Sequence, residues 1–109
     1  MRLVTVRLST EVDETEIRVR MKGFRRRRSI PLDGVRGVKI VTYDPVKDFG
    51  GYGIRKTKSG VAMVARGNRG VRLEMRDGTM TVIGSQRAEA LAAAIATARK
   101  RLADRPKLK

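Results

Sequence analysis

The chain has 109 residues, and its 26 Lys and Arg residues outnumber its 11 Asp and Glu residues, for a formal net charge of +15. It contains no Cys and no His, which excludes disulfides and thiolate metal sites and removes the usual metal ligand and general base at neutral pH. This length suits one domain that buries roughly two-thirds of its unfolded surface, and the cationic surplus favours polyanionic partners.

Two kinds of targeting segment are not found in the sequence. No stretch reaches the roughly 18 apolar residues of a membrane span. Residues 1–9 are too short and too charged for a signal peptide. We therefore expect a soluble chain that was not exported by such a signal.

The first predicted strand covers Leu3–Ser9, where apolar residues occupy alternate positions at Val4, Val6 and Leu8. A cluster of acids follows, made up of Glu11, Asp13, Glu14 and Glu16. We interpret this cluster as a solvated turn, or as a partner of the basic stretch that comes next. Two close carboxylates can act as acid and base only where a cleft separates their pKa values, and the sequence indicates no such cleft.

A second strand is predicted where Ile17, Val19 and Met21 alternate with cations. Gly23-Phe24 turns the chain, and a run of four arginines follows. The candidate ligand-binding residues are the basic side chains of this region: Arg18, Arg20, Lys22, Arg25, Arg26, Arg27 and Arg28. We expect them to form one exposed surface for an anionic ligand. The alternative is a solubilising strand edge without a ligand.

In the middle of the chain, the sequence pattern predicts further strands on either side of a glycine-rich loop. Pro31 suits a strand end or a sheet edge, and Lys39–Tyr43 is rich in β-formers. We expect a loop over 44–60. Its glycines match no nucleotide-binding fingerprint, because Lys56 stands where the third glycine of the dinucleotide pattern belongs and Thr57 where the last glycine of the P-loop belongs. Short strands from Ile54 and over 61–65 precede a turn at 67–70.

A hairpin and a helix complete the chain. Val71, Leu73 and Met75 alternate with charged residues, Asp77-Gly78 suits a tight turn, and 79–83 is the returning strand. The helix is predicted over 86–103 with Ser85 or Gln86 as its N-cap. Its apolar stripe should pack over the hairpin: Leu91, Ile95, Ala98 and Leu102.

Several segments resemble an uncharacterised bacterial branch of the pleckstrin-homology-like (PH-like) domains. They are Arg27–Val35, Tyr43–Pro45, Gly50–Arg55, Gly67–Glu74 and Ile83–Arg87. Two positions depart from the pattern, since Tyr52 stands where that branch has Trp and Ala88 where it has Pro. The resemblance implies a mostly β fold, a PH-like antiparallel barrel or sandwich of about seven strands closed by one C-terminal amphipathic helix. We expect a single PH-like domain over 1–105 and a short basic tail over 106–109.

The expected function is that of a non-enzymatic binding module near an anionic membrane surface. PH-like relatives often carry transmembrane helices before the domain, so the expected location is cytoplasmic, with membrane association through a neighbouring segment absent from this chain. Two alternatives stay open: a nucleic-acid-binding basic domain, and a protein-interaction or oligomerisation barrel without a polyanion ligand. An enzyme is disfavoured because no spacing indicates a catalytic set, and we expect no metal and no cofactor.

Overall fold

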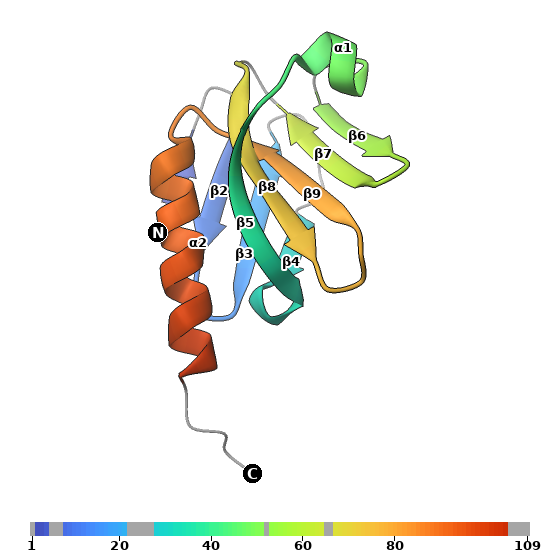
Figure 1. Ribbon diagram of the computed structural model, residues 1–109. Coiled ribbons are helices and arrows are strands. Elements are labelled where there is room, and N and C mark those ends of the chain that lie inside the picture. Colours follow the sequence, from blue (N-terminus) through green and yellow to red (C-terminus); the bar gives the residue numbers. More distant parts are fainter. Residues whose placement is uncertain (1, 5–7, 22–27, 52, 65–66, 105–109) are drawn as a thin grey trace.

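The structure, a computed structural model, describes residues 2–4, 8–21, 28–51, 53–64 and 67–104. Within these residues the chain forms a mostly β sandwich of two sheets with one long C-terminal helix (Figure 1). The N-terminal sheet contains, in spatial order, β1 (Arg2–Val4), β2 (Leu8–Val12), β3 (Glu16–Met21) and β4 (Arg28–Pro31). The C-terminal sheet contains, in spatial order, β5 (Val35–Thr42), β8 (Arg69–Met75), β9 (Met80–Gly84), β7 (Gly60–Val64) and β6 (Gly53–Thr57). Three helical segments complete the fold: the 3₁₀ turn η1 (Leu32–Gly34), α1 (Pro45–Phe49) and α2 (Ala88–Ala103).

The N-terminal sheet is an antiparallel meander, and it corrects the predicted first strand. In place of one strand over Leu3–Ser9 there are two, β1 and β2, while residues 5–7 lie outside the described part. The acidic cluster is also more ordered than a solvated loop, because Glu11 belongs to β2 and Glu16 begins β3. Asp13 forms the turn between them, where its Oδ1 accepts hydrogen bonds from the backbone N–H groups of Thr15 and Glu16. The predicted strand over 17–21 is confirmed as β3.

The C-terminal sheet confirms the β8–β9 hairpin but not a wholly antiparallel arrangement. β8 and β9 pair in antiparallel register, with Val71 opposite Ile83. β9 then lies between β8 and β7, and its pairing with β7 is parallel. Hydrophobic alternation specifies which side chains face inward but not the direction of the neighbouring strand, so the sequence pattern could not reveal this pair.

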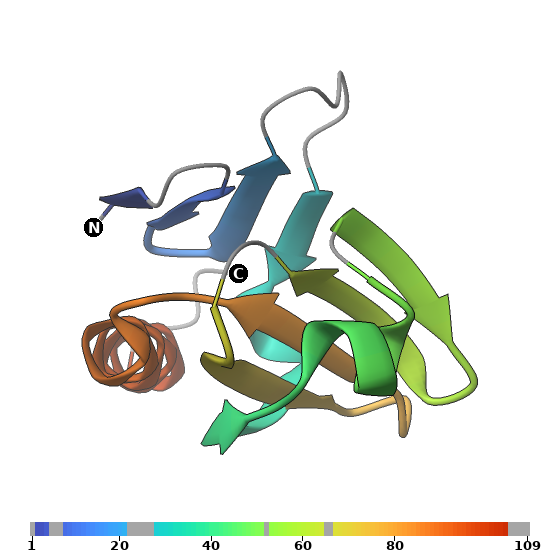
Figure 2. The same ribbon diagram turned by 90° about the horizontal axis from the view of Figure 1, so that it is seen from above.

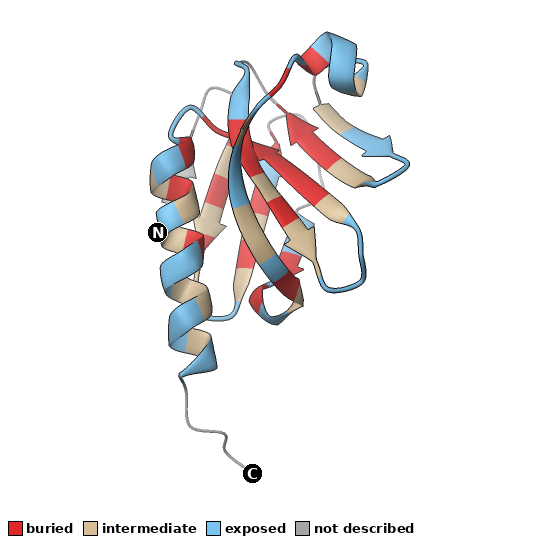
Figure 3. Ribbon diagram, in the orientation of Figure 1, coloured by how far each residue is buried: buried red, intermediate tan, exposed pale blue. Residues whose placement is uncertain are grey.

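The two sheets pack face to face, and the core lies between them (Figures 2 and 3). Alternate residues of β3 and β8 point into the core, as their burial shows, and their neighbours point outward. In the described part of the chain, each strand pairs only within its own sheet, so the sandwich is not closed into a barrel. This layered arrangement gives the protein two outer sheet faces that point in opposite directions.

Helix α2 covers one side of the sandwich and contacts β2, β5, β8 and η1. Leu91 and Ile95 are fully buried, and Leu102 packs against the same core as the hairpin, which confirms the predicted packing. The helix begins later than predicted. Arg87 is the N-cap residue, and Ser85 Oγ instead accepts the Arg87 N–H in the turn before the helix, at 3.1 Å.

The loop predicted over 44–60 contains helix α1, which was not predicted, and the short strand predicted from Ile54 is confirmed as β6. Asp44 caps α1 by accepting hydrogen bonds from Val46 N–H and Lys47 N–H, both at 3.1 Å. Gly50 ends the helix with φ +75°. Phe49 of α1 packs edge to face against Tyr43, with ring centroids 5.3 Å apart. This pair covers a second apolar cluster on the outer face of the C-terminal sheet, formed by Ala62, Val64 and Val82.

The packing of α2 gives a first prediction. Ile95→Ala should lower the free energy of unfolding by about 2–5 kcal/mol, because it removes a fully buried side chain and leaves a cavity. Urea denaturation measures this change. Thr97→Ala, at an exposed position of the same helix, is the matched control and should change stability little. Equal effects of the two substitutions would contradict the packing of α2 on the sheets.

The parallel pair gives a second prediction. Gly60 has φ +153°, and a Cβ there would lie 1.8 Å from the Met80 carbonyl oxygen of β9. Gly60→Ala therefore combines backbone strain with a clash that forces β7 away from β9. Gly78→Ala is the control, since Gly78 has φ +89° and open space around it. The control should cost about 1–3 kcal/mol from strain alone, and Gly60→Ala should cost clearly more in the same urea titration. A smaller loss at Gly60 would argue against the β7–β9 register.

Candidate functional site

Arg18, the first of the seven candidate residues, is bonded to three carboxylates and is not a free cation. Its guanidinium donates to Glu11 of β2, to Asp13 of the turn and, at 2.9 Å, to Glu16 of its own strand. The β2–β3 register explains this, because it places Glu11 directly opposite Arg18. The acidic cluster therefore pairs with the basic stretch, as one of our two interpretations predicted.

This arrangement favours the ionised forms of Asp13 and Arg18. The pKa of Asp13 falls from its ordinary 3.8 to about 2, chiefly because its carboxylate accepts the backbone N–H groups of Thr15 and Glu16, with Arg18 as a smaller cause. The hydrogen bonds to Glu11, Glu16 and Asp13 raise the pKa of Arg18. We call this group the Arg18 acidic cluster: Arg18 with Glu11, Asp13 and Glu16.

Two other candidate residues, Arg20 and Arg28, are exposed. They lie on the neighbouring strands β3 and β4, at the end of the N-terminal sheet away from the acidic turn. The segment 22–27 connects these strands, and the remaining candidates fall on it: Lys22, Arg25, Arg26 and Arg27. Those four lie outside the described residues. We call Arg20 and Arg28 the basic end of the N-terminal sheet.

A second cationic group, which the sequence analysis missed, lies on the outer face of the C-terminal sheet. Glu74 of β8 accepts a bond from Lys39 of β5 at 3.1 Å and one from Arg72 at 3.4 Å, and Arg36 lies 3.9 Å away. The pKa of Glu74 is lowered, first by the hydrogen bond from Lys39 and then by the nearby positive charges. We call these four residues the Glu74 cationic cluster. Only the β5–β8 register, with Lys39 opposite Arg72, brings them together.

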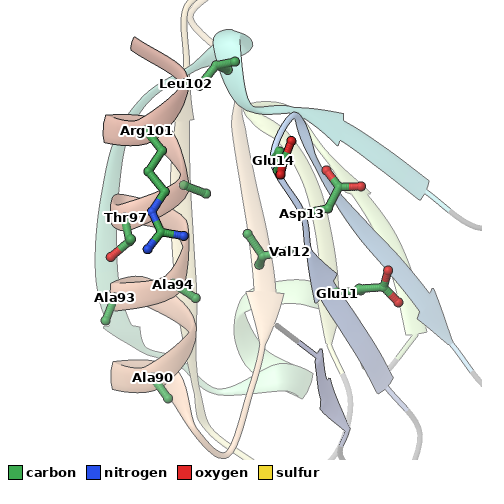
Figure 4. Close-up of a pocket in the computed structure, with 11 residues that line it drawn as sticks. Glu11, Val12, Asp13, Glu14, Ala90, Ala93, Ala94, Thr97, Arg101 and Leu102 are labelled. Carbon is green, nitrogen blue, oxygen red and sulfur yellow. The ribbon is translucent and has the colours of Figure 1, made fainter. Parts of the chain in front are cut away.

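A groove of about 1020 Å³ runs between α2 and the β2–β3 turn (Figure 4). Alanines of α2 form much of one wall, with Thr97, Arg101 and Leu102, and the other wall contains Val12 and three acids. Two of those acids, Glu11 and Asp13, are bonded to Arg18. The groove thus places an apolar wall of α2 beside carboxylates, two of which are bonded to Arg18.

Neither a metal centre nor a membrane-spanning helix is found in the described part of the chain. No group of three or more acidic side chains there is arranged to hold a metal ion. No helix among these residues is long and apolar enough to cross a membrane. Comparison with known proteins gives no match to any family model, curated protein or solved structure. The positions of the charged side chains on the two sheets are therefore the observations on which a functional proposal can be based.

The lowered pKa of Asp13 gives a third prediction, for the dependence of stability on pH. A carboxyl group whose pKa is lower in the folded than in the unfolded state stabilises the fold above the unfolded pKa, and that stabilisation is lost as pH falls through the folded pKa. For Asp13 the window runs from about pH 4 down to about pH 2. Asp13→Asn keeps a side-chain acceptor for the turn but removes the charge.

Urea denaturation across this window should show a shallower fall in stability for Asp13→Asn than for the wild type. Some fall should remain, because the pKa values of Glu74, Asp77 and Glu89 are lowered as well. Superimposable pH profiles of the two proteins would contradict the role given to the Asp13 carboxylate.

Proposed function

We propose that the protein is a non-enzymatic binding domain of the PH-like type, which associates with an anionic membrane surface through the basic end of the N-terminal sheet. The observation that carries this proposal is the charge separation along that sheet. Its acids gather at the β2–β3 turn around Arg18, whereas Arg20 and Arg28 are exposed toward the other end. The connection between these two strands adds four more cations within six residues.

The charge is sufficient for weak, reversible binding to a bilayer. Each Lys or Arg near an anionic bilayer contributes about 1 kcal/mol, and this attraction falls off within a Debye length of about 8–10 Å. Cations concentrated at one end of a sheet can approach the surface together, whereas a uniform distribution of the same net charge would place most of them too far away. A neighbouring membrane-attached segment would strengthen such binding by raising the local concentration.

The PH-like assignment is part of the proposal. It is supported by the sequence resemblance and by the β-rich sandwich with its single C-terminal helix. The parallel β7–β9 pair is a departure from the antiparallel arrangement that the resemblance implied. Of the alternatives, nucleic-acid binding would use the same cations, but the described aromatic residues offer little for base stacking, because Tyr43 is buried and Phe49 packs against it.

A fourth prediction tests the proposed surface. Arg20→Gln/Arg28→Gln should weaken sedimentation with vesicles of phosphatidylcholine and phosphatidylglycerol by about 30-fold at low salt, the equivalent of about 2 kcal/mol for two cations. The control is Lys56→Gln/Lys58→Gln, which removes the same charge from exposed positions at the β6–β7 hairpin. It should weaken binding much less. Neutral phosphatidylcholine vesicles should bind neither variant.

Three results would contradict the proposal. If the wild-type protein does not sediment with anionic vesicles at low salt, the proposed membrane binding is wrong. Equal weakening in the two variants would show that net charge matters and the basic end does not. A mobility shift on nucleic acid at salt concentrations that abolish vesicle binding would favour the nucleic-acid alternative.

A further inference from the structure

The Glu74 cationic cluster carries a surplus of two positive charges on the outer face of the C-terminal sheet, whereas the proposed membrane contact belongs to the N-terminal sheet. Its three cations surround one carboxylate, at 3.1, 3.4 and 3.9 Å. The side chains of Arg36 and Lys39 are 64% and 60% exposed, so a ligand can reach them while Glu74 holds them together. These charges are placed by the sheet register, because Lys39 and Arg72 occupy opposite positions on β5 and β8.

Arg72 adds an unsatisfied hydrogen-bond donor to this cluster. Its Nε is buried and has no hydrogen-bond partner, although its Nη2 lies 3.4 Å from Glu74. A buried N–H without a partner is unfavourable. The guanidinium therefore gains hydrogen bonds if it turns outward to a phosphate group, which accepts two parallel N–H bonds from arginine.

An exposed apolar side chain belongs to α1, the helix whose Phe49 packs on the outer face of the C-terminal sheet. Arg72 is registered with Val82, and Val82 belongs to the apolar cluster against which Phe49 of α1 packs. Phe49 of α1 therefore packs on the same side of the C-terminal sheet as Arg72. Val46 of the same helix is 66% exposed, beside the exposed Lys47. Cations next to an exposed apolar residue suit a bilayer interface better than a free phosphate ion.

We propose that the Glu74 cationic cluster and Val46 form a second contact surface for anionic bilayers, so that one molecule can bridge two membranes. This inference rests on the proposed function for the first contact. In β3, Ile17, Val19 and Met21 point into the core, so Arg20 faces out of the N-terminal sheet. In β8, Val71 and Leu73 point into the same core from the other side, so Arg72 faces out of the C-terminal sheet. Arg20 and the Glu74 cationic cluster therefore face away from each other, whereas Arg28, which is registered with the core residue Val19, is exposed at the end of the N-terminal sheet.

Vesicle clustering tests this inference separately from vesicle binding. Anionic phosphatidylglycerol vesicles with two different fluorescent labels are mixed with the protein, and energy transfer between labels reports clustering while sedimentation reports binding. The wild type should do both. Lys39→Gln/Arg72→Gln/Val46→Ser should still bind through the basic end, but its half-maximal clustering concentration should rise at least about tenfold. Arg20→Gln/Arg28→Gln should lose clustering to at least the same extent, and the weakened binding that remains should occur through the second surface.

Lys56→Gln/Lys58→Gln is again the charge-matched control and should cluster vesicles like the wild type. If the triple variant is unfolded by circular dichroism, Lys39→Gln/Val46→Ser, which leaves the Arg72–Glu74 contact in place, replaces it. Wild-type protein that binds vesicles but does not cluster them would overturn this inference and leave the proposed function intact. Undiminished clustering by the folded surface variant would overturn it too, since self-association through one surface would then explain the bridging. Wild-type protein that binds no anionic vesicle would overturn both proposals.

Discussion

The burial of alternate strand residues between the two sheets determines which charged residues of β3 and β8 face outward. Val19 of β3 and Leu73 of β8 are almost fully inaccessible, and each forces its neighbours in the strand to face outward. A shift of one residue in either strand would bury cations and expose the core, so the register is strongly specified. The charged surfaces are therefore a direct consequence of the hydrophobic packing, and α2 secures that packing by burying Leu91 and Ile95 against the same core.

The few acids of this basic protein create two opposite electrostatic environments. Around Arg18, three carboxylates surround one cation, which leaves that corner of the N-terminal sheet acidic. Around Glu74, three cations surround one carboxylate, which leaves the outer face of the C-terminal sheet basic. Exposed ion pairs contribute little to stability. Their main effect here is to orient long side chains and to decide which parts of the surface can attract an anion.

Local patterns in the sequence predicted the elements that depend on neighbouring residues. The β8–β9 hairpin follows from strict alternation around Asp77-Gly78, and α2 follows from the spacing of Leu91 and Ile95. Helix α1 was missed because five residues are too few for a 3.6-residue period, although Asp44 and Gly50 are typical cap residues. For the candidate site, the structure bears only on the exposure and the contacts of individual cations. Arg20 and Arg28 are exposed as expected, but Arg18 is bonded to Glu11 across a strand pair.

The Glu74 cationic cluster and the parallel β7–β9 pair were not predicted, and the reason is the same for both. Each depends on which strands become neighbours, and a single sequence contains no direct record of that choice. Arg72 and Glu74 were visible as outward residues of one strand, but Lys39 joins them only because β5 pairs with β8 across more than thirty intervening residues. Net charge is thus a weak guide to function by itself, because it does not distinguish cations bonded to carboxylates from cations that can bind a partner. The pairing of the strands makes that distinction, because it joins Arg18 to carboxylates on one sheet and gathers Arg36, Lys39 and Arg72 around a single carboxylate on the other.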